Sequence, residues 1–226
     1  MKYLIDSANL EEIRHGNEFY PIAGVTTNPT LVAKEETDLK ALISDLRGII
    51  GGKKMLHVQT TAKKAEGIVR EAELLSDTAG GDFYVKIPIG EEGLKAASIL
   101  KKRGIGVTMT AIFTPQQALL AANAGADFVA PYVNRLDNIS ANGVQTVEEI
   151  VRLFDIYMLE CQVLAASFKN VRQLHEVALA GAHCATVSGG LLLSAASHPM
   201  TDSAVQGFDR DWAAAYGSRS VADLLK

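Results

Sequence analysis

Short apolar runs alternate with longer amphipathic stretches along the whole chain. The runs are rich in β-branched residues and bounded by glycine, proline or polar residues, which is typical of strands buried on both faces. The stretches between them repeat apolar residues at the spacing of one helical face. Eight strands are predicted, at 3–5, 21–25, 55–58, 82–88, 106–110, 127–130, 162–166 and 184–187.

Capping signals place the starts of several helices in this alternation. Asn9 with a glutamate three residues later, and Thr114 followed by proline and glutamine, both have the pattern of a helix N-terminus. Thr37, Thr146 and Asn170 are the expected starts of three further helices. The chain is therefore a succession of βα units without a low-complexity linker.

Eight consecutive βα units predict one α/β fold. Parallel strands need a crossover helix each, and eight of them close into a (β/α)8 or TIM barrel, here a single domain over 1–226. A C-terminal helical extension, about 202–226, follows the eighth unit. Val205, Phe208, Trp212 and Ala215 form one apolar stripe on it, which needs either a neighbouring subunit or the chain's own barrel as cover.

Composition narrows the class of partner. The chain has 226 residues, a formal net charge of −4 and 6% aromatic residues, without a basic stripe. We therefore expect a small-molecule partner and neither nucleic acid nor a membrane. Cys161 and Cys184 lie in apolar surroundings, and no signal-like apolar region is seen at the start, so a cytoplasmic protein is expected. The five histidines show no metal-type spacing, and neither metal nor another cofactor is expected.

One charged residue interrupts a predicted buried strand. Lys86 lies within the apolar run 82–88. Burial disfavours the ammonium form, and a neutral amine in a dry pocket attacks carbonyl groups. The alternative is that Lys86 extends from the end of the strand into solvent.

Polar side chains recur where the predicted strands end. In a barrel these ends share one mouth, where catalytic groups are found, so we expect the side chains to converge. Each also has a purely structural interpretation: Asp6 as a helix cap, Asn28 as a turn residue, Thr110 as a donor to a backbone carbonyl. The complete set is Asp6, Asn28, Gln59, Lys86, Thr110, Tyr132, Arg135, Ser167 and Lys169.

Four motifs together resemble the transaldolase family in its short bacterial branch. They are Gly-Val-Thr-Thr-Asn-Pro at 24–29, Val-Lys-Ile-Pro at 85–88, Ala-Pro-Tyr-Val-Asn-Arg at 130–135 and Leu-Ala-Ala-Ser-Phe-Lys at 164–169. The resemblance covers essentially the whole chain. It implies class I aldolase chemistry, in which a lysine forms an imine with a ketose phosphate and a dihydroxyacetone unit remains on the enzyme after C3–C4 cleavage.

The resemblance also implies roles for the residues at the strand ends. Lys86 is the imine-forming amine and Asp6 the acid–base group. Gln59, Thr110 and Tyr132 match the positions that hold a catalytic water. Substrate binding falls to four further residues: Asn28 for the dihydroxyacetone hydroxyls, and Arg135, Ser167 and Lys169 for the phosphate. Lys169 has an equally good interpretation as a solvated loop lysine. The resemblance further implies a homo-oligomer, for which a decamer of two pentameric rings is one form.

Gln59 with Tyr132 resembles the fructose-6-phosphate aldolase type within this family. That implies cleavage of fructose 6-phosphate to dihydroxyacetone and glyceraldehyde 3-phosphate. The alternative is a transaldolase that passes the dihydroxyacetone unit to an aldose phosphate in the pentose phosphate pathway, or the same chemistry on a sulfonated sugar. Two other classes stay open: a different phosphosugar barrel with its phosphate at Gly189 and Gly190, and a non-catalytic barrel retained for binding.

Overall fold

The computed structural model describes residues 1–226. The chain divides into two compact units, Met1–Leu191 and Leu192–Lys226, which are described separately. The extension expected from about residue 202 falls inside the second unit.

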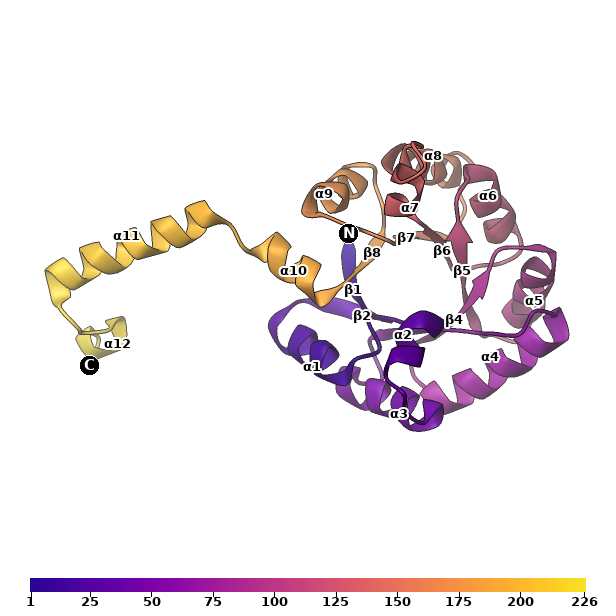
Figure 1. The fold of residues 1–226 in the computed structure, drawn as a ribbon, viewed down its shortest axis with the longest axis horizontal. Helices are drawn as coiled ribbons and strands as arrows, with labels where there is room; N and C mark the ends of the chain where they lie inside the picture. The colour runs from indigo at the N-terminus through magenta and orange to yellow at the C-terminus, as the bar shows by residue number, and fades with distance from the viewer. The chain divides into compact units, whose positions relative to one another are not determined.

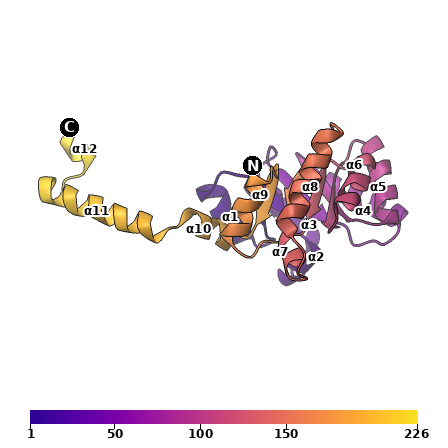
Figure 2. The ribbon, with the colours of Figure 1, turned by 90° about the horizontal axis from the view of Figure 1, so that it is seen from above.

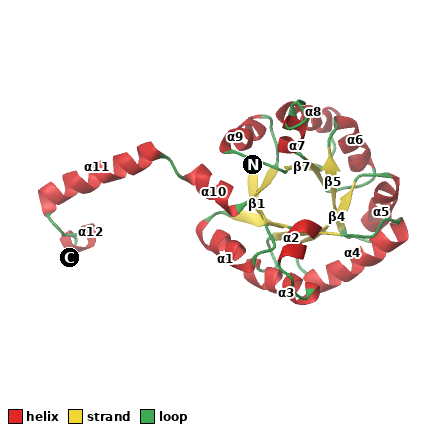
Figure 3. Ribbon diagram, viewed as in Figure 1, coloured by secondary structure: helices red, strands yellow, loops and turns green.

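Eight parallel strands form a closed barrel in the first unit (Figure 1), as predicted. Each strand pairs with its neighbours in chain order, and the eighth pairs with the first. Figure 3 shows the strands enclosed by the helices. The strands are β1 (Lys2–Asp6), β2 (Ile22–Thr26), β3 (Met55–Gln59), β4 (Phe83–Pro88), β5 (Gly106–Ile112), β6 (Phe128–Pro131), β7 (Gln162–Ala165) and β8 (Cys184–Val187).

Helices connect successive strands around the barrel. Those of the first unit are α1 (Leu10–Phe19), α2 (Pro29–Lys34), α3 (Leu39–Ile50), α4 (Ala65–Ala79), α5 (Glu91–Lys102), α6 (Pro115–Asn123), α7 (Val133–Asp137), α8 (Gly143–Ile156), α9 (Val171–Leu179) and the start of α10 (Gly189–Ala196). The short helices α2 and α7 were not predicted. They follow β2 and β6 directly, and Figure 2 shows both at the same end of the barrel.

Two of the five predicted helix starts are wrong. The N-cap of α3 is Asp38 rather than Thr37, because the Asp38 carboxylate accepts a hydrogen bond from the N–H of Ala41 at 2.8 Å. The N-cap of α8 is Asn142, and Thr146 lies inside that helix, where its hydroxyl donates to the Asn142 carbonyl. The caps at Asn9, Thr114 and Asn170 are confirmed. A cap is fixed by which side-chain oxygen meets the orphan N–H groups, and nearby polar residues compete for that position.

The interior of the barrel is apolar at one level and polar at the next. Leu4, Met55, Phe128, Leu164 and Cys184 form a buried apolar cluster. Buried polar side chains follow this cluster on two of the same strands, β3 and β8, and occur on the intervening strands β2, β4 and β5: His57, Thr186, Thr26, Lys86, Thr108 and Thr110. Since side chains alternate between faces along a strand, these residues extend a polar interior toward the carboxyl ends.

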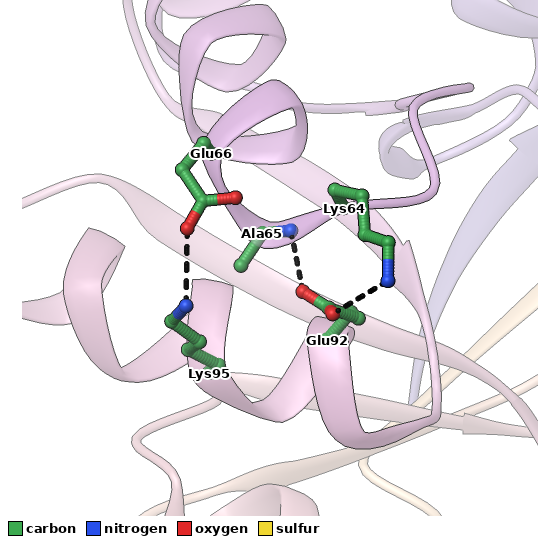
Figure 4. Close-up of polar contacts among 5 residues, drawn as sticks. All are labelled: Lys64, Ala65, Glu66, Glu92 and Lys95. Atoms are coloured by element: carbon green, nitrogen blue, oxygen red, sulfur yellow. Dashed lines mark hydrogen bonds and ion pairs between the residues drawn. The ribbon is translucent and has the colours of Figure 1, made fainter.

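Helices α4 and α5 are joined by polar contacts between their first turns (Figure 4). Lys64, at the N-cap position of α4, makes no capping bond with its side chain. Glu92 of α5 supplies the missing acceptor, taking hydrogen bonds from the N–H of Ala65 at 2.8 Å and from Lys64 Nζ at 3.2 Å. Glu66 and Lys95 add a second ion pair at 3.0 Å. The neighbouring helix thus caps the end of α4, which fixes the loop after β3.

The second unit contains the rest of α10, α11 (Pro199–Tyr216) and α12 (Val221–Leu224). Within this unit Trp212 Nε1 donates to the Arg219 carbonyl at 2.7 Å, and the rings of Trp212 and Tyr216 lie 4.7 Å apart. No residue of α11 is buried. None of the helices in the chain has the length and apolar character needed to cross a membrane.

Candidate active site

Lys86 is buried inside the barrel near the carboxyl end of β4. Its side chain is only 5% exposed, and Nζ donates a hydrogen bond to the Thr27 carbonyl at 2.8 Å. Burial lowers the pKa of the amine, and the negative charge of Asp6 partly opposes that shift. The alternative that Lys86 extends into solvent is therefore excluded. The site holds an amine whose neutral form is favoured relative to a free lysine.

Asp6 ends β1 and belongs to a hydrogen-bond chain across three strands. Its carboxylate accepts from the Thr26 hydroxyl at 2.7 Å, and the hydroxyls of Thr26 and Thr186 lie 2.6 Å apart. A hydroxyl has one proton, so Thr186 must donate when Thr26 donates to Asp6. Asp6 does not cap α1, because Asn9 does. The network fixes one carboxylate oxygen, Oδ1, through the Thr26 hydroxyl.

Asn28 lies at the mouth as the N-cap of α2. Its side-chain carbonyl accepts from the N–H groups of Thr30 and Leu31 at 3.0 and 3.1 Å. The structural interpretation of Asn28 as a turn residue is corrected: the residue caps a helix, and this role uses the carbonyl oxygen alone. The amide nitrogen still has two donors available for a ligand.

Gln59, Thr110 and Tyr132 lie at or near the carboxyl ends of β3, β5 and β6. Gln59 pairs in register with Lys86 on the adjacent strand. The hydroxyls of Thr110 and Tyr132 lie 3.1 Å apart, so Thr110 meets a side chain rather than a backbone carbonyl. Ala111 has a left-handed φ of 58° where the β5–β6 register shifts. Such a bulge redirects the strand end after Thr110, which is common beside active sites.

The predicted phosphate-binding residues follow β6 and β7. The Arg135 guanidinium lies over the Tyr132 ring, 4.7 Å from its centroid. This cation–π contact holds the positive charge beside Tyr132. Ser167 has a left-handed φ of 63°, and its carbonyl accepts from the N–H of Asn134 at 2.7 Å. Backbone strain of this kind concentrates at functional sites. Lys169 is exposed, and only its backbone N–H makes a contact, to Gln173 at 2.7 Å.

A phosphate site after β8 is disfavoured by a carboxylate already placed there. Glu12 accepts from the N–H of Gly189 at 2.8 Å through one oxygen and from the Ser7 hydroxyl at 2.5 Å through the other. A phosphate at the same position would be repelled by this charge and would lose the Gly189 donor. Arg135 and Ser167 thus remain the better phosphate candidates.

Sequence reasoning missed four buried polar residues beneath the strand ends: Thr26, His57, Thr108 and Thr186. Threonine is also a common strand former, so its presence in a strand carries little information by itself. For three of them the signal lay in the alternation, because Thr26, His57 and Thr108 are each two positions before a predicted site residue. Thr186 had no such signal, since no site residue was predicted on its strand.

A depression of about 520 Å³ lies beside Gln59, between the loops that follow β3 and β4. Pro29 and Pro88 also line it. The chain contains no group of three or more histidine, cysteine or acidic side chains arranged to hold a metal ion.

The fold and this mouth define a (β/α)8 barrel with a buried lysine among polar strand ends. Residues 3–220 match the family described as transaldolase/fructose-6-phosphate aldolase. The chain belongs to this family. It is therefore an enzyme of the lyase or transferase type.

Some relatives that are similar over the full length are named as transaldolases, and another is named as a fructose-6-phosphate aldolase. A probable transaldolase of Lachnoclostridium phytofermentans is 41% identical over 217 residues, which are 96% of this chain and 100% of the relative. A probable fructose-6-phosphate aldolase of Streptococcus pneumoniae is 39% identical over 223 residues, 98% of this chain and 100% of the relative.

Solved structures support the barrel at much lower sequence similarity. A structure titled "Native KDPGal structure" has a TM-score of 0.60 at 14% identity and covers 90% of this chain and 95% of its own. A dihydrodipicolinate synthase from Rhodopseudomonas palustris has a TM-score of 0.59 at 14% identity, with coverages of 92% and 78%. At this identity the likeness concerns the fold alone.

Proposed function

We propose that this enzyme is a Schiff-base aldolase that cleaves fructose 6-phosphate to dihydroxyacetone and glyceraldehyde 3-phosphate, and catalyses the reverse addition. The single observation that supports it most is Lys86, buried, with a lowered pKa and its Nζ fixed at the Thr27 carbonyl. An amine in this state attacks a ketone, and the protonated imine that follows accepts the electrons of a breaking C–C bond.

In this proposal Lys86 and Asp6 perform the bond-making steps. Lys86 Nζ adds to the C2 carbonyl, and loss of water leaves an imine. Asp6 takes the proton of the C4 hydroxyl as the C3–C4 bond breaks, so glyceraldehyde 3-phosphate leaves and the electron pair becomes an enamine. Protonation of the enamine carbon and addition of water to the imine then release dihydroxyacetone and free Lys86. Asn28 binds hydroxyls of the three-carbon unit through the donors of its amide nitrogen, since its carbonyl oxygen already accepts from Thr30 and Leu31.

Gln59, Thr110 and Tyr132 hold the water that enters and leaves with the imine. The 3.1 Å contact between the Thr110 and Tyr132 hydroxyls supports a shared role, since two hydroxyls can pass one proton between them. Arg135 and Ser167 bind the phosphate of the long sugar arm. Lys169 is exposed and contributes charge at most, so we assign it the weakest role of the set.

The competing proposal is a transaldolase that keeps the enamine until an aldose phosphate arrives. Relatives named as probable transaldolases favour it. A phenol that holds the catalytic water favours release of free dihydroxyacetone, and this is our reason for preferring the aldolase.

Two measurements test the proposal. Fructose 6-phosphate supplied without an acceptor should yield free dihydroxyacetone, whereas a strict transaldolase should yield it only in trace amounts unless an acceptor is present. Borohydride added with dihydroxyacetone should inactivate the enzyme and leave a three-carbon adduct on the peptide that contains Lys86. Lys86→Met is the matched control and should take up no adduct. Labelling of another lysine would refute the mechanism.

A further inference from the structure

His57 lies inside the barrel with one ring nitrogen unpaired. Its side chain is 0% exposed, and Nδ1 lies 2.8 Å from the Thr108 hydroxyl. Nε2 is buried and has no hydrogen-bond partner within the protein. An unpaired polar atom in a dry interior destabilises a fold, so such an atom is a candidate for contact with a ligand.

The contacts of the ring place it under the Lys86 side chain. His57 is on β3 and its side chain contacts Thr108 on β5, so it passes over the inner face of the intervening strand β4. The imidazole stacks on Tyr84 of β4 at 4.8 Å, and Thr108 is in register with Lys86 rather than with Tyr84. The ring therefore lies on the mouth side of Tyr84, at the level below Lys86.

The Lys86 side chain extends along the inner face of the barrel in the opposite direction. Its Nζ reaches the Thr27 carbonyl just beyond β2, which brings the side chain across β3, the strand that carries His57. The two side chains thus cross, one above the other. Consistent with this proximity, burial and then the positive charge of Lys86 lower the pKa of His57 well below its usual range, so the ring is neutral.

The shape of the substrate decides which of its groups can meet the ring. This step rests on the proposed function. The ketone carbon attached to Lys86 has two arms, and the long arm with the phosphate must extend to the open mouth, where Arg135 lies. The short arm, a single hydroxymethyl group, is then directed into the closed interior. A neutral imidazole can donate or accept one hydrogen bond according to its tautomer, which suits a hydroxyl.

We propose that Nε2 of His57 binds the hydroxyl of this short arm, so that the His57–Thr108 pair selects donors of the dihydroxyacetone type over donors with a methyl group in its place. Packing alone does not need a histidine here. A phenylalanine can make the same stack on Tyr84 and the same edge contact to Phe128, which now lies 5.2 Å from the imidazole.

The test compares dihydroxyacetone with hydroxyacetone as donors, with glyceraldehyde 3-phosphate as acceptor. His57→Phe keeps the shape of the ring and removes both nitrogens. The ratio of kcat/KM for dihydroxyacetone to that for hydroxyacetone should fall about 3- to 10-fold, the effect of one neutral hydrogen bond. Phe128→Leu is the control: it removes the edge contact to the His57 ring without removing a polar atom and should leave the ratio unchanged.

An unchanged ratio in His57→Phe, including the case in which kcat/KM falls equally for both donors, would overturn the inference and give His57 a structural role. If His57→Phe does not unfold cooperatively, Thr108→Val decides by the same ratio, because it frees the ring from its fixed orientation. A crystal structure of the borohydride-reduced adduct should show a hydroxyl within hydrogen-bond reach of Nε2, and a water there would contradict the proposal. Failure of wild-type Lys86 to form any adduct would instead refute the proposed function.

Discussion

Removing the Tyr132 hydroxyl tests the choice between aldolase and transaldolase. Tyr132→Phe keeps the ring, its edge contact with Phe113 at 5.5 Å and the Arg135 guanidinium above it. It deletes the 3.1 Å contact with Thr110, whose side chain is 1% exposed. Leaving that buried hydroxyl unpaired should cost about 1–3 kcal/mol of stability. For a chain of this size, we expect a lower Tm by roughly 2–4 °C for each kcal/mol.

The effect on the reaction should be larger than the effect on stability. If the phenol holds the water that releases the enamine, loss of this donor should slow dihydroxyacetone release on the order of 10²-fold. Transfer of the same unit to an added aldose phosphate should fall much less, because it needs no water at the enamine step. The assay measures free dihydroxyacetone and transfer product from one batch of fructose 6-phosphate, with and without the acceptor.

Two further variants separate the phenol from its partner. Thr110→Val breaks the same contact from the other side and keeps the phenol, so it reports what the pair contributes as a unit. Gln59→Glu should shift the partition toward transfer, since a carboxylate can act as a base on the water where an amide only orients it. Equal losses of release and transfer in Tyr132→Phe would place the hydroxyl in a step common to both reactions, and our reason for preferring the aldolase would be wrong.

Three other perturbations follow from the site and the second unit. Arg135→Ala should raise KM for phosphorylated substrates by a factor that corresponds to about 1.5–3 kcal/mol of lost binding free energy, with little effect on KM for dihydroxyacetone. Equal effects on both KM values would make the residue structural. Deletion of residues 202–226 should change the oligomer mass in light scattering, because α11 buries none of its side chains within its own unit. The stability of wild type relative to Lys86→Met should rise with pH between the lowered folded pKa of Lys86 and about 10.4, its unfolded value, since the unfolded chain there binds the extra proton. Urea titrations across that range measure it, and a flat difference would contradict the buried amine.

The barrel could be predicted from the sequence because its signal is repeated. Each βα unit supplies an apolar run and an amphipathic stretch, so an error of one or two residues at a strand end does not change the topology. The caps at Thr37 and Thr146 failed because several polar residues stood near each helix start, and only the folded backbone decides which oxygen meets the free N–H groups. The helices α2 and α7 were missed because each is too short to show a period.

The strand-end rule, by which polar residues at the carboxyl ends of barrel strands share one mouth, identified the candidate residues and their common location. It did not reveal their hydrogen-bond partners. The bond from Lys86 to the Thr27 carbonyl joins residues from different strands, and nothing in the local sequence specifies that contact. The Thr26–Thr186 contact spans most of the barrel's chain length in the same way. Contacts of this kind follow from closure of the barrel, which the sequence predicts only in outline.

The polar layer beneath the strand ends explains why the site extends deeper than that rule suggests. Barrel interiors are usually filled by branched apolar side chains, which pack without unpaired polar atoms. Here Thr26, His57, Thr108 and Thr186 occupy a buried layer instead, and each hydroxyl needs a partner. The hydrogen-bond chain to Asp6 pairs the hydroxyls of Thr26 and Thr186, and the imidazole pairs that of Thr108. Two buried side-chain atoms remain unpaired: Nε2 of His57 and the hydroxyl of Thr27, whose carbonyl binds Lys86. Both unpaired atoms belong to residues around the lysine. A core shaped by stability alone would not concentrate them there, whereas a pocket for a polyhydroxylated substrate would.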